Sequence, residues 1–337
     1  MKRTTFTRLV TIAALPFSIM ACGGGGDGGG TGNNTCTPGA GGQTAKYVVN
    51  AVKVPMDKTS YAIDVNGDSR TDNQLGNIIG ALSQQGLDVE KGVKDAIDAG
   101  SLIILGTETS SDAGFTADTC AGFRLQLGSL LTGTTVPDYS GNGTFMGGGD
   151  ESDVFAGPIT GSKFSSGSPV TAKTPVNVTI ALPLIPMATP VVLKITAAQL
   201  TVTRAANGTI TGGELHGVIK DVDVKGKIIP NVAELLTSKI NDGSSTGADI
   251  SRLFDTGGSK EPPDCPDSCK VSAGVCAMKA DKKIDVCEVA TSGLIQNVLA
   301  PDVQMFDAAG NYAPNKANTT KDSLSLGLSF DMVGAKF

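Results

Sequence analysis

Residues 323–332 alternate between apolar and small or polar side chains without an error. The two interleaved sets are Leu324, Leu326, Leu328, Phe330, Met332 and Ser323, Ser325, Gly327, Ser329, Asp331. A period of two is the pattern of a β-strand with one buried and one solvated face. The chain must therefore supply antiparallel partners for this strand and a core for its apolar face to cover.

Other segments with the same period predict further strands. Residues 123–131, 176–184 and 191–195 alternate in this way, and 101–105 is a short apolar run typical of a buried strand. The dipeptide Asn207-Gly208 separates 200–204 from 209–215, which is the usual signal of a tight hairpin. Residues 132–172 are rich in Gly, Ser and Thr and indicate loops or short strands.

A few segments have helical periodicity instead. Apolar residues recur three and four positions apart in 75–82, 89–99 and 232–240, and 289–299 is helical up to Pro301. Pro230 suits the first turn of the third helix. The predicted fold class is therefore α+β, mainly antiparallel β with a few interposed helices.

The N-terminus has the order of an exported, cleaved leader. Lys2, Arg3 and Arg8 precede an apolar run of twelve residues, 9–20, and Ala21 stands before Cys22. The run is too short to cross a bilayer, which takes about 20 residues. A glycine-rich stretch follows, and its composition is that of a flexible tether.

This junction resembles the lipobox of bacterial lipoproteins. The resemblance implies that the leader is removed before Cys22, that the cysteine receives diacylglycerol, and that its new amino group is acylated, for example with palmitate. The predicted organisation is a signal peptide at 1–21, a tether at 22–44 and a β-rich globular domain at 45–337, with a sub-boundary near 132–172 as an alternative. The expected location is the bacterial cell envelope, at the outer membrane rather than the inner one.

Charge narrows the class of partner. Loss of the leader removes three positive charges and no acid, so the formal charge goes from −6 to −9. A negative surface disfavours nucleic acid. The expected partners are the membrane, through the N-terminal lipid, and an envelope or surface protein that the sequence does not identify.

Six cysteines remain after Cys22 is set aside. They are Cys36, Cys120, Cys265, Cys269, Cys276 and Cys287. An even number in an exported protein predicts three disulfides, and we expect one between Cys36 and Cys120 and two within the late cluster. A four-cysteine zinc site in that cluster is the alternative.

The motif with the clearest chemistry is Asp-Val-Asn-Gly-Asp-Ser-Arg-Thr-Asp. Asp64, Asn66, Asp68 and Asp72 place side-chain oxygens at loop positions 1, 3, 5 and 9, and the carbonyl of Arg70 is available at position 7. Calcium takes six to eight oxygen ligands, which such spacing supplies from one short segment. The sequence therefore predicts a structural calcium ion here, and a metal-free turn in which Asp72 caps the following helix is the alternative.

The segment resembles the calcium loops of EF-hand and dockerin proteins. Gly67 stands at position 4, as it often does in dockerins. Ser69 replaces the glycine of position 6, and Leu75 stands where an EF-hand has its bidentate glutamate. Further oxygen must come from elsewhere, for which Asp88 and Glu90 are candidates.

A weaker, partial match to such a loop lies at Asp281, Asp285 and Glu288, before the helix predicted at 289–299. Its first half lacks ligands, so a disulfide-bound turn is the default expectation there.

Signals for an enzyme are weak. His216 is the only histidine and lies outside any catalytic motif. The acids Asp150, Glu151 and Asp153 would suit a glycosidase. A chain with no Trp and four Tyr, however, offers few aromatic side chains on which a sugar ring could stack.

Three functions follow, in order of preference. The first is a noncatalytic envelope lipoprotein whose calcium-ordered domain acts in binding, adhesion or envelope structure. The second is a carrier of an apolar or lipid ligand, suggested by the apolar segments at 176–195. The third is a hydrolase that uses His216. The segment Lys-Asp-Ser-Leu-Ser-Leu-Gly-Leu-Ser-Phe and the Asp-rich loop also resemble a group of predicted, uncharacterised bacterial lipoproteins, which implies no activity.

Overall fold

The computed structural model describes residues 38, 42–84, 86, 88–149, 151–182, 190–255, 257–260, 269 and 276–337. The chain divides into two compact units, Met1–Thr35 and Cys36–Phe337. All described residues belong to the second unit. Cys22, Cys36, Cys265 and Asp150 lie outside the described residues.

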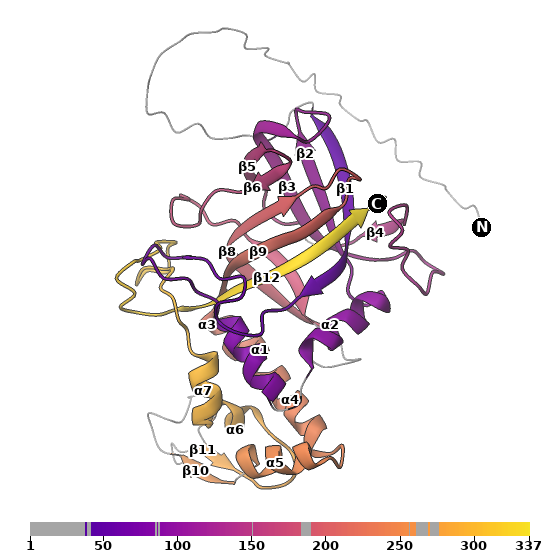
Figure 1. Cartoon of the computed structure of the whole chain (residues 1–337). Coiled ribbons are helices and arrows are strands. Elements are labelled where there is room, and N and C mark those ends of the chain that lie inside the picture. Colours follow the sequence, from indigo (N-terminus) through magenta and orange to yellow (C-terminus); the bar gives the residue numbers. More distant parts are fainter. Residues whose placement is uncertain are drawn as a thin grey trace, which may run out of the picture. The chain divides into compact units, whose positions relative to one another are not determined.

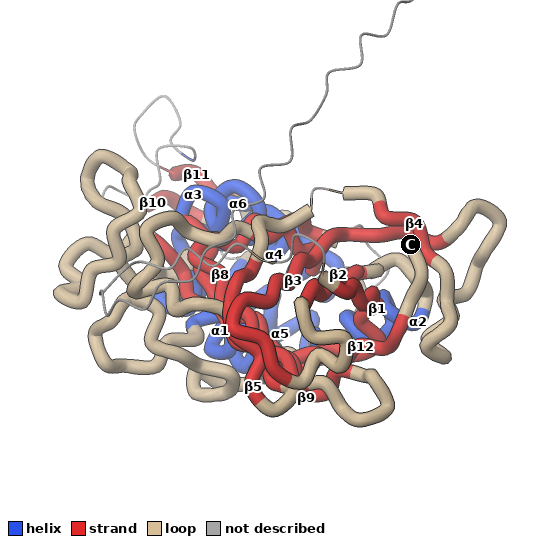
Figure 2. Tube along the Cα trace, turned by 90° about the horizontal axis from the view of Figure 1, so that it is seen from above, coloured by secondary structure: helices blue, strands red, loops and turns tan. Residues whose placement is uncertain are grey.

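Eight antiparallel strands of the described chain close into a β-barrel (Figures 1 and 2). In chain order the barrel strands are β1 (Gln43–Lys53), β2 (Ile104–Ser110), β3 (Ala117–Leu130), β5 (Phe155–Thr160), β6 (Lys163–Ser165), β8 (Val191–Thr203), β9 (Ile210–Lys220) and β12 (Ser323–Gly334). Each pairs with the next, and β12 pairs with β1 to complete the ring. The barrel thus has up-and-down order.

Two short strands extend this sheet, and two others form a separate one. β4 (Phe145–Gly147) pairs with β3, and β7 (Val178–Leu182) pairs with β8. β10 (Gly258–Lys260) and β11 (Cys276–Met278) pair with each other. The predicted mainly antiparallel β fold is confirmed, and barrel closure makes it more specific.

The helices pack at the barrel and on one another. The helical segments are α1 (Gln74–Gln84), α2 (Val89–Asp98), α3 (Asp221–Asp223), the π-helical turn η1 (Val224–Ile228), α4 (Ile229–Ile240), α5 (Ser245–Phe254), α6 (Val286–Thr291) and α7 (Gly293–Leu299). α1 packs against β12 and α2 against β1 (Figure 1). α4 contacts α5 and α6, while α7 joins α6 to α1.

Several local predictions are confirmed. The Asn207-Gly208 turn joins β8 to β9, and Gly208 has the positive φ of 82° that this turn requires. Both helices predicted after residue 74 are present. α4 has a proline in its first turn.

Two predicted elements differ from the structure. The helix predicted at 289–299 is broken at Ser292, which has an extended backbone. Its first part begins earlier, at Val286, because Asp285 and Glu288 form a capping box. The strand predicted at 101–105 begins later, at Ile104, and runs on to Ser110, so that it includes Glu108, which forms a buried ion pair with Arg204.

The prediction that one face of the last strand, β12, is exposed to solvent is wrong. Ser323, Ser325 and Ser329 on the second face of β12 are at most 3% exposed. Loop segments cover this face and satisfy its polar groups: Ser325 donates to Asp302, and the Gly327 N–H donates to Asn73. Small side chains are required here so that these segments can approach the strand.

The barrel interior contains an aromatic and charged region. Glu108 is 2% exposed and accepts hydrogen bonds from Tyr47 Oη at 2.9 Å and Arg204 Nη2 at 2.7 Å. The Arg204 guanidinium also lies 4.1 Å from the ring centre of Phe115. Burial, followed by the Glu108 carboxylate, raises the pKa of Tyr47 above its ordinary value.

Glycine at position 106 makes room for the aromatic packing. A Cβ at Gly106 would lie 2.6 Å from Met332 Cε and 3.0 Å from the Phe123 ring. Phe123 stacks with Tyr47 at 6.1 Å between ring centres. These side chains fill the interior next to the Glu108 ion pair.

Removing one member of that ion pair should be costly. Glu108→Ala leaves the Arg204 cation buried, so we expect it to lower the free energy of unfolding by about 3 to 5 kcal/mol. The exposed pair of Arg124 and Glu151, 2.9 Å apart, supplies the control, and Glu151→Ala should cost less than about 1 kcal/mol. Urea denaturation measures both, and equal effects would contradict the burial argument.

Candidate metal centre

The 64–72 loop lies between β1 and α1 and is closed at its base. The Asp72 N–H donates to the Ile63 carbonyl oxygen at 2.8 Å, so residues next to the two ends of the loop form an antiparallel bridge. The following residue, Asn73, is 1% exposed and accepts a hydrogen bond from the Gly76 N–H with its side chain. Asn73, rather than the predicted Asp72, therefore caps α1.

Three carboxylates converge within the loop. Asp64, Asp68 and Asp72 each offer an oxygen, and these oxygens lie within 4.8 Å of one another. In the part of the chain that the structure describes, this is the one such group of three His, Cys, Asp or Glu residues. The sequence placed these three acids together correctly.

Backbone hydrogen bonds hold the loop in shape around the carboxylates. Asp64 Oδ1 accepts from the Gly67 N–H at 2.6 Å, and Asp64 Oδ2 accepts from the Ser69 N–H at 2.8 Å. Asn66 is 1% exposed and its Oδ1 accepts from the Asp68 N–H. Arg70 lies in the same loop, and its N–H donates to Asp68 Oδ1 at 2.9 Å. The role of the Arg70 carbonyl as a ligand stays a prediction.

The serine at position 6 does not prevent the required backbone turn. Ser69 has a φ of +67° and Gly67 a φ of +85°. Glycine is favoured at the sharp turn of a calcium loop because it adopts such angles at no steric cost. Ser69 takes up the left-handed conformation despite its Cβ, so the backbone course is kept where the sequence departs from the motif.

Asp72 has a raised pKa and an unsatisfied oxygen atom. Burial, followed by the charges of Asp302 and Asp68, raises the pKa of Asp72 to about 7. Its Oδ2 is buried and makes no hydrogen bond. A buried carboxylate oxygen without a donor is a costly arrangement that a bound cation would relieve.

Asp302 is the acid near the loop that sequence reasoning missed. It is held by Ser325, whose N–H donates to Asp302 Oδ1 at 2.8 Å, and burial raises its pKa above the ordinary value. The structure gives the predicted distant ligand Asp88 another role, because its side chain caps α2 by accepting from the Lys91 N–H. Only the fold brings Asp302, 230 positions further along the chain, to this loop.

The four cysteines that the structure describes form disulfides. The Sγ atoms of Cys269 and Cys287 are 2.22 Å apart. Cys120 and Cys276 each belong to a further disulfide. This arrangement agrees with the predicted disulfide framework and overturns the zinc alternative for the late cluster, because bridged sulfurs are not free thiolates. The expected bridge between Cys36 and Cys120 involves a residue outside those described.

The weaker acidic segment at 281–288 is a turn and a cap. Asp285 accepts from the Cys287 and Glu288 N–H groups, and Glu288 accepts from the Asp285 N–H. Asp281 accepts from the Lys283 N–H. The bonds of Asp285 and of Glu288 Oε2 order the start of α6, while the other Glu288 oxygen, Oε1, is buried and makes no hydrogen bond.

His216 bridges β9 to the segment that precedes the loop. It is 2% exposed, with Nδ1 3.0 Å from the Tyr61 carbonyl oxygen and Nε2 3.2 Å from Glu214 Oε2. Burial lowers the pKa of His216 below its ordinary value, although the Glu214 carboxylate opposes this. Both ring nitrogens are thus engaged within the chain.

The other acids weighed for catalysis have structural partners as well. Glu151 forms the surface ion pair with Arg124, and Asp153 accepts from the backbone N–H and the side-chain amide of Asn177.

No protein family, curated protein or solved structure matches the chain. Among the described residues, the helices are too short or too polar to span a membrane.

The buried imidazole should make stability depend on pH. With a folded-state pKa below the unfolded value of about 6.5, His216 contributes stability that is complete above that pH and is lost as the pH falls. Urea denaturation of the wild type and of His216→Gln at about pH 7.5 and 5.5 should show a smaller acid loss in the variant. Glu214→Gln removes the charge that favours the imidazolium, so its acid loss should exceed that of the wild type.

Proposed function

We propose that this chain is a noncatalytic lipoprotein of the bacterial envelope, whose β-barrel domain is ordered by calcium and serves in binding or envelope structure. The observation that carries the proposal is the convergence of the Asp64, Asp68 and Asp72 oxygens within 4.8 Å. Attachment through acylated Cys22 and an outer-membrane location rest on the sequence of the leader.

The residues fit a hard cation. Asp64, Asp68 and Asp72 supply carboxylates, Asn66 supplies an amide oxygen, and the Arg70 carbonyl completes the set that the loop offers. Calcium accepts such oxygen donors in irregular numbers and fills the remainder with water. The buried Asp72 oxygen that lacks a hydrogen bond supports this fit.

The chemistry supplied by the cation would be structural. The loop continues directly into Asn73, whose amide donates to the carbonyls of Ser60 and Gly327 at 2.6 and 3.0 Å. Neutralising three acids at this point would hold the loop and α1 against β12. The lack of a bidentate glutamate suggests an affinity in the extracellular range, with a dissociation constant of about 0.1 to 1 mM.

Calcium should therefore stabilise the folded domain. At about 10 mM calcium, dissociation constants of about 0.1 to 1 mM correspond to about 2.7 to 1.4 kcal/mol of added stability. Asp72→Asn should abolish this gain, and without calcium it should unfold no more readily than the wild type because it removes a repelled, buried charge.

Asp112→Asn is the matched control for that experiment. Asp112 is likewise a loop aspartate that accepts backbone hydrogen bonds, from Gly114, Thr116 and Ala117, but it lies outside the acidic group. Its variant should keep the full calcium gain in thermal denaturation. A wild type whose melting temperature does not respond to calcium would remove the cation from the proposal.

The anchor is tested separately. Cys22→Ala should abolish incorporation of labelled palmitate and release the protein from washed membranes, because acylation supplies the stable attachment. Cys120→Ala, which affects a disulfide instead, should keep the label. Labelled palmitate on the Cys22 variant would contradict the assignment.

A further inference from the structure

An open cleft lies where β9 runs into α3, against the 304–322 segment that leads into β12. Its volume is about 420 Å³. Small-molecule sites in proteins typically measure about 300 to 1,000 Å³. Lys220 and Asp221 line the cleft from the end of β9, and the other lining residues include Gln304 and Phe306. No residue of the 64–72 loop lines it, so the cleft is separate from the proposed calcium centre.

Gln304 presents a fixed hydrogen-bond donor to the cleft. It is 9% exposed, and its Oε1 accepts from the Asn315 side-chain amide at 3.1 Å and from the Thr320 N–H at 3.2 Å. The N–H and the hydroxyl of Thr319 donate to the same oxygen at 3.1 and 3.3 Å. Four donors identify this atom as the oxygen and set the orientation of the amide. The nitrogen, Nε2, donates to no residue that the structure describes, and it is not fully buried.

Lys220 supplies a second donor to the same cleft. Its Nζ lies 4.1 Å from the ring centre of Phe306, and it makes no hydrogen bond or ion pair with any described residue. The nearby Lys225, in contrast, is paired with Asp221 at 2.5 Å. An ammonium group and an amide nitrogen can only donate hydrogen bonds. The ligand group that lies beside Lys220 and Gln304 must therefore be an acceptor.

The acids that line the cleft limit the charge of the ligand. Asp322 is used by the chain itself, because its oxygens accept from the N–H groups of Met305 and Phe306. Asp221 accepts one side-chain hydrogen bond and Asp307 three, while a carboxylate has room for about four. These carboxylates would repel an anion that carries no positive charge. A simple cation would be repelled by the lysine and would leave both donors unsatisfied.

We propose that the cleft binds a small zwitterion of the amino-acid or short-peptide class. The ligand carboxylate accepts from Lys220 Nζ and Gln304 Nε2, and the ligand ammonium donates to Asp221 or Asp307. Both acids lie next to the donor side, since Asp221 directly follows Lys220 and Asp307 directly follows Phe306, the ring under the lysine ammonium.

The rest of the lining suits an uncharged ligand side chain. Val222 lines the cleft and is 71% exposed, and the Phe306 ring lines it as well. Covering this apolar surface with a ligand side chain would add affinity.

Leucine and leucyl-leucine are the probes, titrated calorimetrically into the full chain. Each should bind at least about tenfold more tightly than N-acetylleucine, which lacks the ammonium, and than leucinamide, which lacks the carboxylate. A wild type that binds neither probe would overturn the proposal. Binding of N-acetylleucine or leucinamide as tight as that of leucine would also overturn it, because the site would then not recognise both charges.

Two variants test the donors. Gln304→Glu removes only the donor, because a carboxylate at this position can still accept the four hydrogen bonds. Lys220→Met removes the charge and keeps an apolar side chain of similar length. Each variant should weaken leucine binding at least about tenfold.

Lys227→Met is the matched control. It removes one positive charge as Lys220→Met does, but Lys227 is paired with Asp223 at 2.9 Å and does not line the cleft. This variant should bind leucine as tightly as the wild type. Unchanged leucine binding by Lys220→Met would contradict the site, and that measurement decides the matter if Gln304→Glu does not fold.

Discussion

Pairing of the last strand with the first is the constraint on which the rest of the structure depends. β12 pairs with β9 on one side and with β1 on the other, so a sheet that would otherwise have two open edges becomes a closed ring. Closure leaves no unpaired barrel edge, but it also creates an interior that side chains must fill. The composition of that interior then decides how tightly each part of the barrel is packed.

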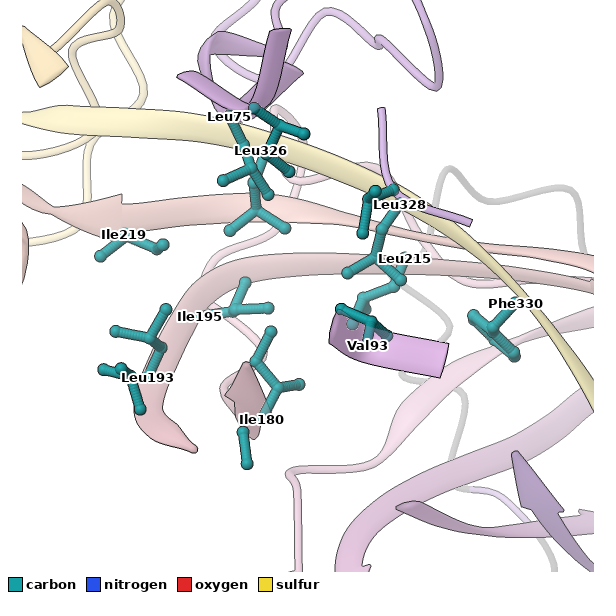
Figure 3. Packing of buried hydrophobic residues seen from close by; sticks show 14 of the residues in the cluster. Leu75, Val93, Ile180, Leu193, Ile195, Leu215, Ile219, Leu326, Leu328 and Phe330 are labelled. Atoms are coloured by element: carbon teal, nitrogen blue, oxygen red, sulfur yellow. The ribbon is translucent and has the colours of Figure 1, made fainter. Parts of the chain in front are cut away.

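Two kinds of side chain occupy different parts of the interior. Tyr47, Phe123, Glu108 and Arg204 form a packed, hydrogen-bonded group whose geometry admits few alternatives. Aliphatic side chains around Val93 and Leu215 leave a small cavity of about 30 Å³ instead (Figure 3). A buried ion pair adds little net stability but penalises wrong packing strongly. One part of the barrel is therefore tightly specified, while the other keeps free volume.

The sequence was most informative where a signal is local. The Asn207-Gly208 turn, the periodicity of α1 and α2, and the acids of the 64–72 loop all depend on residues within one turn or one short segment. The β1 segment carries no clear strand pattern, because its alternation is interrupted by a register shift between Val49 and Ala51. A bulge of this kind places adjacent residues on unexpected faces and hides the period of two.

Long-range contacts could not be predicted for a different reason. Glu108 looks like a surface residue until Arg204, 96 positions away, is placed beside it. Ser325 likewise looks solvent-facing until Asp302 and the Gln74 N–H bind its hydroxyl group. In each case burial follows from a partner that only the closed barrel supplies. The sequence therefore predicts the acidic 64–72 loop itself, but not the distant residues that the fold places around it.

The acidic loop and the cavity share one strand. On the outer side of β12, the Asn73 side chain donates a hydrogen bond to the Gly327 carbonyl and accepts one from the Gly327 N–H. A Cβ at Gly327 would lie 1.8 Å from the Tyr61 carbonyl oxygen. On the inner side, the next residue, Leu328, forms part of the cavity wall. Contacts that fix the outer face of β12 therefore also fix the wall of the cavity. A glycine between them is required, because any side chain at 327 would push the segment leading to the loop away from the barrel.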